Sequence, residues 1–221
     1  MTEASKHHEM PFVRIELAVL SLVESRLCVL LGKRTQEPYA GRWALPGGVL
    51  RIDADVDLEA AARRTALERL NVDLPVVRQL VAVGSKHRDK GRAPWALAVV
   101  YRALVPFDLF APVAGKRLDG LRWVPVDDAA TDTQIAFDHA SLVGLAAAAT
   151  RQEFEELRLP AELLPDTFTL GELQSLCEQV LGRPLDKSSF RRKLADRGLV
   201  EPVEGEVRGG ANRPAKIYRA V

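Results

Sequence analysis

Residues 41–74 have the sequence GRWALPGGVLRIDADVDLEAAARRTALERLNVDL, and this pattern is the most informative in the chain. Pro46-Gly47-Gly48 predicts a glycine-rich turn. Asp57 then suits the N-cap of a helix over LEAAARRTALERL, in which Ala and Leu recur at helical spacing on one face. The charged residues of this helix, among them Glu68 and Arg69, lie on its other faces. The segment therefore predicts a turn followed by a helix that packs against a core.

The residues on both sides of this segment predict a mixed sheet. Before it, residues 13–22 and 27–31 alternate between apolar and polar side chains, which predicts two strands joined by a turn at Glu24 and Ser25. Helices between and after strands are typical of a mixed α/β domain. The other predicted elements are strands at residues 76–83, 96–105 and 121–126, and an alanine-rich helix that begins near Asp138 and His139 and runs past Ala149.

Length and composition suit two domains in one chain. A chain of 221 residues that is 47% hydrophobic can bury one substantial core and still form a second, small domain. Lys and Arg (31) almost balance Asp and Glu (30), so any DNA binding has to be local. The polar first ten residues and the lack of a long apolar run predict neither a signal peptide nor a membrane anchor. Cys28 and Cys177 stand apart as free thiols, so we expect a cytoplasmic protein.

Residues 41–74 also resemble the Nudix box and the strand that leads into it. The family pattern is Gly, five residues, Glu, seven residues, then Arg-Glu-apolar-x-Glu-Glu-x-Gly-apolar. Residues 41–43 (GRW), residues 45–48 (LPGG), the degenerate box and the hairpin before it occur here in the family's order. The resemblance implies an α/β (α+β) Nudix fold, with a mixed sheet packed between helices.

The chain departs from the family pattern at the metal-binding positions. Aligned on Arg64, the helix keeps Glu68, but Thr65 and Arg69 replace two glutamates and Val56 replaces the first one. Nudix hydrolysis needs several carboxylates on one helix face, because Mg²⁺ prefers oxygen ligands and its charge offsets that of the diphosphate. Arg69 either places a cation near the metal position or points into solvent. We therefore expect no catalytic residues, no metal and no cofactor.

The last part of the chain, residues 168–221, predicts a winged helix-turn-helix. Thr169 and Glu172 form a capping box that opens a first helix, and Asp186 caps a second helix. The connection over residues 182–185, GRPL, is short, as in a helix-turn-helix. A short strand at residues 199–200, the loop EGEVRGGANRPAK over residues 204–216 and a last strand at residues 217–219 complete the predicted wing.

Positive charge is concentrated in this C-terminal part. From Thr169 onward there are ten Lys and Arg against seven Asp and Glu, a net charge of +3, which leaves −2 for the first 168 residues. A solvated charged face is the simpler interpretation, but the asymmetry favours a local DNA-binding surface. The second helix of such a motif enters the major groove, so we expect Lys187, Ser188 and Arg191 to reach bases and the others to hold the backbone. The full predicted set is Lys187, Ser188, Ser189, Arg191, Arg192, Lys193, Arg197, Arg208, Arg213 and Lys216.

The two parts in this order are similar to the Nudix-related transcriptional regulators of bacteria. The most specific match is GRPLDKSSFRRKL followed by GGANRPAKIYR. The resemblance implies a homodimer that represses genes of NAD metabolism, or of sugar catabolism, by binding double-stranded DNA at a palindromic operator. It also implies release when ADP-ribose or a related nucleotide fills the Nudix cleft. We predict a disordered tail over residues 1–11, a Nudix-like effector-binding domain over residues 12–157 and a winged-helix DNA-binding domain over residues 158–221.

The effector site is predicted from residues near the box and from a cationic loop. Residues 86–92, KHRDKGR, offer concentrated positive charge for a diphosphate, although a solvated loop is an equally good interpretation. Trp43 either stacks on a base or belongs to the core, and His139 suits a structural hydrogen bond. The predicted effector-binding residues are Arg42, Trp43, Arg64, Glu68, Lys86, His87, Arg88 and Arg92.

Two alternatives remain open. One is an active pyrophosphatase for ADP-ribose or a nucleotide sugar, with the metal on Glu68, Glu59 and the loop aspartates Asp53, Asp55 and Asp57. The other is a regulator whose Nudix domain senses a different molecule, such as a phosphorylated sugar.

Overall fold

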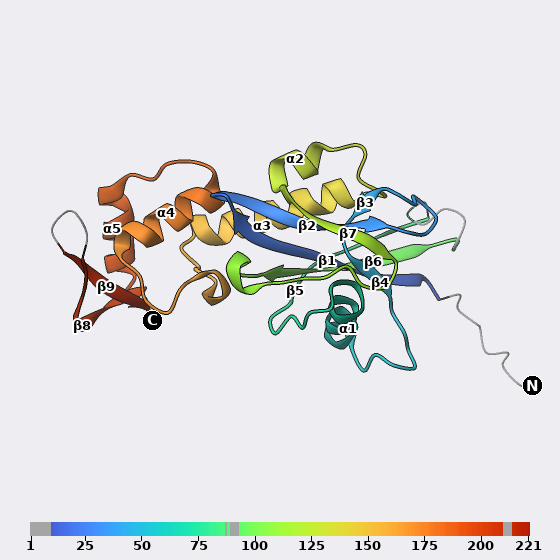
Figure 1. Cartoon of the computed structure of the whole chain (residues 1–221), viewed down its shortest axis with the longest axis horizontal. Coiled ribbons are helices and arrows are strands. Elements are labelled where there is room, and N and C mark those ends of the chain that lie inside the picture. Colours follow the sequence, from blue (N-terminus) through green and yellow to red (C-terminus); the bar gives the residue numbers. More distant parts are fainter. Residues whose placement is uncertain (1–9, 87, 89–92, 210–213) are drawn as a thin grey trace, which may run out of the picture.

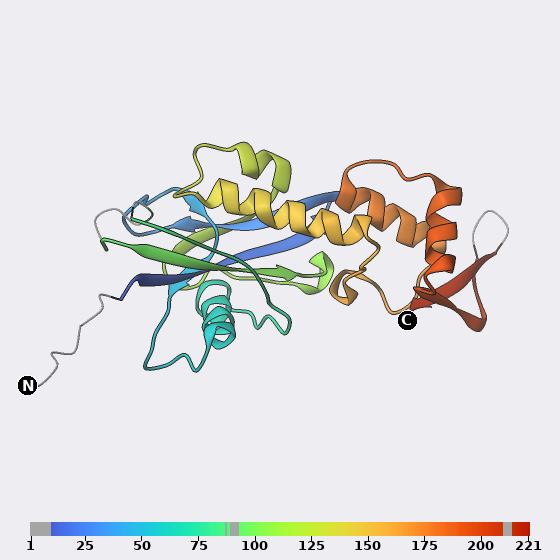
Figure 2. The ribbon, with the colours of Figure 1, turned by 180° about the vertical axis from the view of Figure 1, so that it is seen from behind.

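The computed structural model describes residues 10–86, 88, 93–209 and 214–221. Figure 1 shows a sheet flanked by helices, with a small helical part and a two-stranded ribbon beyond one end of the sheet. Figure 2 shows the same molecule from behind, with α1 on one face of the sheet and α3 on the other. Most of the predicted disordered tail, residues 1–9, lies outside the described residues. The predicted mixed sheet packed between helices, with a winged helix at the C-terminal end, is confirmed.

The sheet of the first part is mixed. Its path is β3-β2-β1-β6-β5, with β4 added on β1 and β7 on β2. The pair β1 and β6 is parallel, and the other pairs are antiparallel. The strands are β1 (Phe12–Val23), β2 (Arg26–Arg34), β3 (Trp43–Ala44), β4 (Gly47–Val49), β5 (Arg78–Ser85), β6 (Ala96–Leu104) and β7 (Leu118–Pro125).

Helices cover both faces of this sheet. α1 (Leu58–Leu70) begins where predicted, because the Asp57 side chain accepts a hydrogen bond from the backbone N–H of Ala60. On the opposite face lie α2 (Val126–Thr131) and α3 (His139–Glu155). Each face has its own apolar core, one beneath α1 and one beneath α3. Short 3₁₀ turns lie at η1 (Phe107–Leu109) and η2 (Ala161–Leu163).

The C-terminal part is a winged helix. α4 (Leu170–Leu181) opens with the predicted capping box of Thr169 and Glu172, and α5 (Lys187–Asp196) is capped by Asp186. The predicted wing was wrong in one respect, because β8 (Val200–Arg208) runs well into the predicted loop and pairs with β9 (Ala215–Ala220). A two-stranded ribbon buries little, so its sequence lacks the apolar alternation that marks a strand.

The two parts share one apolar core. The cluster beneath α3 continues from Phe154 at the end of this helix into Phe168, Leu173 and Cys177 of the winged helix. The connector contributes too, because Leu157 and Leu163 belong to the same cluster. None of the helices in the described parts of the chain is long and apolar enough to cross a membrane.

Candidate functional site

A buried ion pair lies beneath the glycine-rich turn. Glu16 in β1 is fully buried, and its Oε1 accepts a hydrogen bond of 2.8 Å from Arg14 Nε. His139 Nε2 lies 3.7 Å from the same oxygen. Burial alone raises the pKa of Glu16, but the Arg14 charge and His139 outweigh it and lower the pKa to about 2. Glu16 is therefore an anion held inside the fold.

The turn fits closely over this carboxylate. A Cβ at Gly47 would lie 1.8 Å from Glu16 Oε2, so only glycine is accommodated there. His139 supports the neighbouring residue, because its Nδ1 accepts a hydrogen bond of 3.0 Å from the backbone N–H of Leu45. This is the structural role predicted for His139. The glycine-rich turn lines a cleft, and Glu16 and His139 support the turn from inside the fold.

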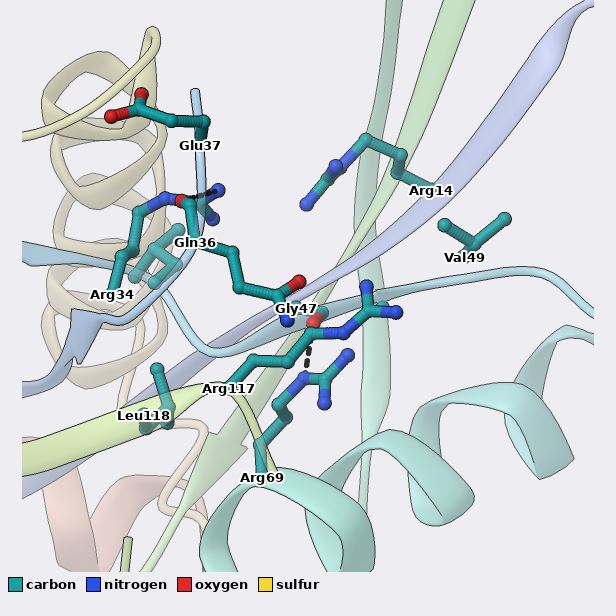
Figure 3. Close-up of a pocket in the computed structure, with 11 residues that line it drawn as sticks. Arg14, Arg34, Gln36, Glu37, Gly47, Val49, Arg69, Arg117 and Leu118 are labelled. Atoms are coloured by element: carbon teal, nitrogen blue, oxygen red, sulfur yellow. Dashed lines mark hydrogen bonds between the residues drawn. The ribbon is translucent and has the colours of Figure 1, made fainter. Parts of the chain in front are cut away.

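Four arginines line this cleft among the described residues. Arg14 comes from β1, Arg34 from the end of β2, Arg69 from α1 and Arg117 from the residue before β7. Figure 3 shows the guanidinium groups of Arg14, Arg69 and Arg117 turned toward a common space beside Gln36. The free space measures about 40 Å³, room for a few water molecules. The other lining residues are Gln36, Glu37, Leu45, Gly47, Gly48, Val49 and Leu118.

Arg69 is fixed at the inner end of the cleft. Its Nε donates to the Gly47 carbonyl at 2.7 Å and its Nη1 donates to the Lys116 carbonyl at 2.9 Å. The residue is only 7% exposed. Burial, and next to it the charge of Arg117, lower the pKa of Arg69. Of the two orientations that the sequence left open, pointing into solvent is therefore wrong, because the Arg69 side chain is bonded inside the fold.

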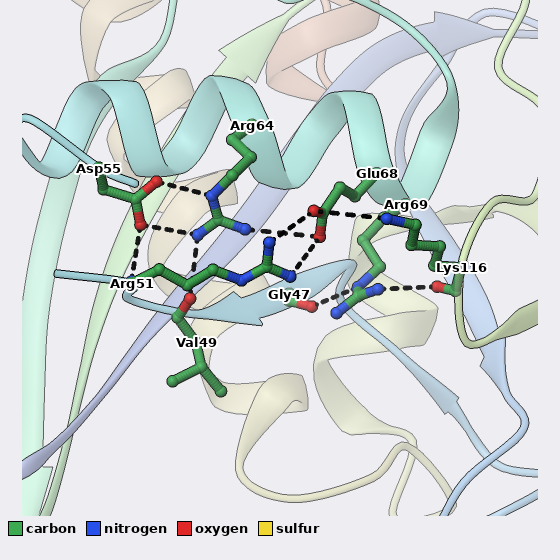
Figure 4. A network of polar contacts seen from close by, with 8 residues as sticks. All are labelled: Gly47, Val49, Arg51, Asp55, Arg64, Glu68, Arg69 and Lys116. Carbon is green, nitrogen blue, oxygen red and sulfur yellow. Dashed lines mark hydrogen bonds and ion pairs between the residues drawn. The ribbon is translucent and has the colours of Figure 1, made fainter. Parts of the chain in front are cut away.

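Glu68 is enclosed by cations (Figure 4). Its two oxygens accept hydrogen bonds of 3.0 and 3.1 Å from Arg51, and Arg64 and Lys116 lie at 3.4 and 3.7 Å. Burial raises the pKa of Glu68, but Arg51, Arg64 and Lys116 together lower it. Glu68 and Arg69 are therefore not ordinary surface charges, because both side chains are largely buried and bonded.

A hard divalent cation, which the Nudix fold implies, does not fit these residues. Glu68 already has three cations around it, and the next residue on the helix, Arg69, brings a fourth positive charge to the same region. The Thr65 hydroxyl is buried beneath Gly48 and has no hydrogen-bond partner within the described ranges. In those ranges no three His, Cys, Asp or Glu side chains converge as a metal site would require. The arginines that line the cleft are instead chemically suited to an anion.

Phe137 connects the cleft to the start of α3. Its ring lies 4.8 Å from the guanidinium carbon of Arg34 and 5.4 Å from that of Arg14. The ring also lies 5.0 Å from that of His139, centroid to centroid. Phe137 has a φ of 60°, which is rare for an aromatic residue. The cleft and α3 are therefore in direct contact.

The predicted effector residues lie around the cleft rather than in it. Arg42 donates to Gln134 at 3.0 Å, and Trp43 is half-buried beneath the Arg122 guanidinium. Arg64 is bonded to Asp55 at 2.6 and 2.7 Å, so it positions the loop before α1. Lys86 is exposed after β5, and Arg88 pairs with Asp138. His87 and Arg92 lie outside the described residues, and the whole set stays a prediction.

Sequence reasoning missed Arg14, Arg34 and Arg117, which line the cleft. They lie far apart in the chain and only the sheet brings them together. One signal was available for Arg14. It and Glu16 are two opposite charges inside the otherwise apolar strand FVRIELAVLSLV, a pattern that indicates a buried ion pair.

The second candidate surface is the exposed face of α5. Phe190 and Leu194 are buried, which leaves Lys187, Ser188 and the two arginines that follow on the solvent side. Ser189 is half-buried, and its N–H donates to the capping Asp186 at 2.8 Å. The exposed polar and basic residues of α5 are Lys187, Ser188, Arg191, Arg192 and Lys193.

Of the remaining predicted DNA contacts, Arg197 and Arg208 are bonded to other residues of the protein, whereas Lys216 is exposed. Arg197 donates to the Glu156 carbonyl at 2.6 Å, so it joins the end of α5 to the end of α3. Arg208 in β8 pairs with Glu172 at 2.5 Å, and Lys216 is exposed on β9. Arg213 lies outside the described residues. These assignments stay predictions.

Comparison with known proteins gives matches for both parts. The NUDIX domain family model matches residues 14–146, and the model of the NrtR DNA-binding winged helix domain matches residues 160–220. The "ADPR responsive transcriptional repressor NtrR" of Acinetobacter baylyi is 34% identical over 209 residues, which are 95% of this chain and 82% of that protein.

Two solved structures from Shewanella oneidensis are also similar. One is NrtR complexed with a 27mer DNA, with a TM-score of 0.75 and 30% identity over 95% of this chain and 93% of that one. The other is the NUDIX domain of the same protein with ADP ribose, with a TM-score of 0.59 and 29% identity over 67% of this chain and 99% of that one.

Proposed function

Since this chain belongs to the family of Nudix-related transcriptional regulators, we propose that it is a DNA-binding repressor released from its operator by a nucleotide in the Nudix cleft. The observation that carries the DNA part is the exposed basic face of α5, beside a two-stranded wing. The Nudix part is supported by a cleft lined by arginines, which suits phosphate groups.

The first experiment is a gel-shift titration on DNA from the protein's own promoter region, with and without ADP-ribose. We expect specific binding that ADP-ribose relieves and that the double variant Arg191→Ala, Arg192→Ala loses. Both arginines are exposed on α5, so the variant should keep its fold, which circular dichroism checks. Specific binding by the double variant would contradict the assignment of α5 as the recognition helix.

The effector we propose is ADP-ribose or a related nucleotide, and the regulated genes are those of NAD or related sugar and nucleotide metabolism. The supporting similarity is to a repressor described as ADPR responsive. A phosphorylated sugar is the competing effector. Titration of ADP-ribose and of sugar phosphates against the protein–DNA complex separates the two.

We propose further that the protein acts as a homodimer on a palindromic operator. Two-fold symmetry then places the half-sites roughly 10 base pairs, or a multiple of that, apart. Footprinting is expected to show two protected half-sites related by symmetry. A single unpaired half-site would contradict the dimer.

We propose that the Nudix domain does not hydrolyse its ligand, because four of the five carboxylates that the pyrophosphatase alternative names have other partners. Asp55 binds Arg64, Asp57 caps α1, Glu59 pairs with Arg63 and Glu68 pairs with Arg51. With Mg²⁺ or Mn²⁺ we expect no release of AMP from ADP-ribose. Release that is lost in Glu68→Gln would establish the enzyme instead.

We also propose limits for the two domains and a location in the cell. We assign residues 12–157 to the effector domain and residues 158–221 to the DNA-binding domain. The location is the cytoplasm, where DNA is accessible and where thiols such as those of the buried Cys28 and Cys177 remain reduced.

A further inference from the structure

We propose that Arg14, Arg69 and Arg117 take over the task of the Nudix metal and bind a phosphate or diphosphate group without any divalent cation. This inference rests on the proposed function only in that the natural ligand is expected to be a nucleotide. It concerns how the charge of that ligand is balanced. In a Nudix hydrolase carboxylates hold cations against the diphosphate, whereas here guanidinium groups meet it directly.

Arg69 is the centre of this site. It occupies a helix position at which the Nudix pattern has a carboxylate, and its side chain is 7% exposed. The Gly47 and Lys116 carbonyls take one N–H each, at 2.7 and 2.9 Å, and hold the planar group in one orientation. A guanidinium has further N–H donors beyond these two, and Figure 3 shows the group facing the cleft. The donors are therefore in place before a ligand arrives.

The charges around Arg69 favour an anion. The carboxylate nearest on the helix, Glu68, is shared among Arg51, Arg64 and Lys116 and has little capacity to neutralise Arg69 as well. Burial and the Arg117 charge disfavour the protonated form and lower the pKa of Arg69. A phosphate oxygen would reverse this effect, because it supplies an opposite charge at short range.

The other two arginines differ in how firmly they are held. Arg14 is fixed from below by Glu16, whose buried carboxylate binds Arg14 Nε at 2.8 Å. Arg117 is exposed and belongs to the loop before β7. The free space of about 40 Å³ encloses only part of a diphosphate, so we expect the exposed Arg117 to adjust when a ligand binds. Arg14 and Arg69 thus form the fixed part of the site, and Arg117 forms its exposed part.

Calorimetric titration of the full chain tests the inference, with ADP-ribose and inorganic pyrophosphate as separate probes. Each is titrated in EDTA and again in Mg²⁺. We expect ADP-ribose to bind with the same Kd in both buffers. Arg69→Gln and Arg117→Gln are each expected to weaken binding about tenfold or more, as for the loss of a charged hydrogen bond. Arg26→Gln, at the exposed hairpin far from the cleft, is the matched control and should bind like the wild type.

The outcomes separate this inference from the proposed function. ADP-ribose binding that needs Mg²⁺ would overturn the arginine site and leave the nucleotide-responsive repressor intact. Pyrophosphate binding in EDTA without any ADP-ribose binding would support the arginine site and overturn the nucleotide effector. Wild-type affinity in both Arg69→Gln and Arg117→Gln would overturn the site, and Arg117→Gln keeps the test valid if Arg69→Gln fails to fold, because Arg117 is exposed.

Discussion

Glu16 makes the stability of this protein sensitive to acid. Its pKa falls from an ordinary value of 4.5 to about 2 in the folded chain, because Arg14 and His139 outweigh the effect of burial. A depressed pKa stabilises the fold above pH 4.5, and that contribution is lost as the pH falls toward 2. The full contribution is about 3 kcal/mol of unfolding free energy.

The corresponding variant is Glu16→Gln, which keeps the shape and removes the charge. We expect it to be less stable than the wild type at pH 7, with a difference that shrinks steadily below pH 4.5. Urea unfolding of both proteins from pH 6 to pH 3 measures this. A difference independent of pH would show that folding does not shift the pKa of Glu16.

Gly47 is predicted to be intolerant of any side chain. A Cβ there would lie 1.8 Å from Glu16 Oε2, and that carboxylate cannot retreat without breaking its pair with Arg14. Gly47→Ala should therefore lower the unfolding free energy by about 3 kcal/mol. Gly171→Ala in α4 is the matched control, because its Cβ would meet nothing closer than 3.8 Å. Thermal melts are expected to show a loss for the first variant and a small gain for the second.

At the scale of elements, the β1–β2 hairpin carries residues that do not suit its turn. Glu24 and Ser25 both have positive φ, 48° and 63°, as in a type I′ turn that favours Asn-Gly. The double variant Glu24→Asn, Ser25→Gly should raise the unfolding free energy by about 1 kcal/mol, because strain at these positions is relieved. Glu24→Ala, Ser25→Ala is the control and should give no gain. Urea unfolding that ranks the two variants equally would contradict this.

The sequence predicted the long elements and missed the short ones. The hairpin, α1, α3, α4 and α5 were expected close to their observed limits, because periodicity and capping residues such as Asp57 and Thr169 are local signals. The strands β3 and β4 have two and three residues, too few for a local pattern, so only the resemblance to the Nudix box implied a strand there, and α2 was missed. The arginine cleft was missed for a different reason. Its members are set side by side by pairing of strands distant in sequence, which no local signal records.

At the scale of the whole molecule, the shared core predicts that both domains unfold together. Phe154 at the end of α3 is 1% exposed and belongs to the same cluster as Leu173 and Cys177 of the winged helix. Calorimetry of the wild type should therefore show one cooperative transition. Phe154→Ala should cost about 3–5 kcal/mol and split this into two transitions. Val113→Ala, at an exposed position, is the control and should keep the single transition.

Helix α3 spans the distance between the two candidate sites. At one end Phe137 and His139 contact the arginines and the buried carboxylate of the cleft. At the other end Arg197 donates to the Glu156 carbonyl and Arg183 pairs with Glu155. One end of α3 is therefore in contact with residues of the proposed ligand site. The other end is bonded to residues of the proposed DNA-binding domain.

Because α3 is long, a small rotation at one end of the helix produces a larger displacement at the other end. Its 17 residues form a rod, and at 1.5 Å per residue such a rod is about 25 Å long. A tilt of about 5° at the cleft end would swing the far end by about 2 Å if the rod stays straight. Because the winged helix is packed on that far end, we expect a small displacement at the cleft to move α5 relative to a groove of DNA.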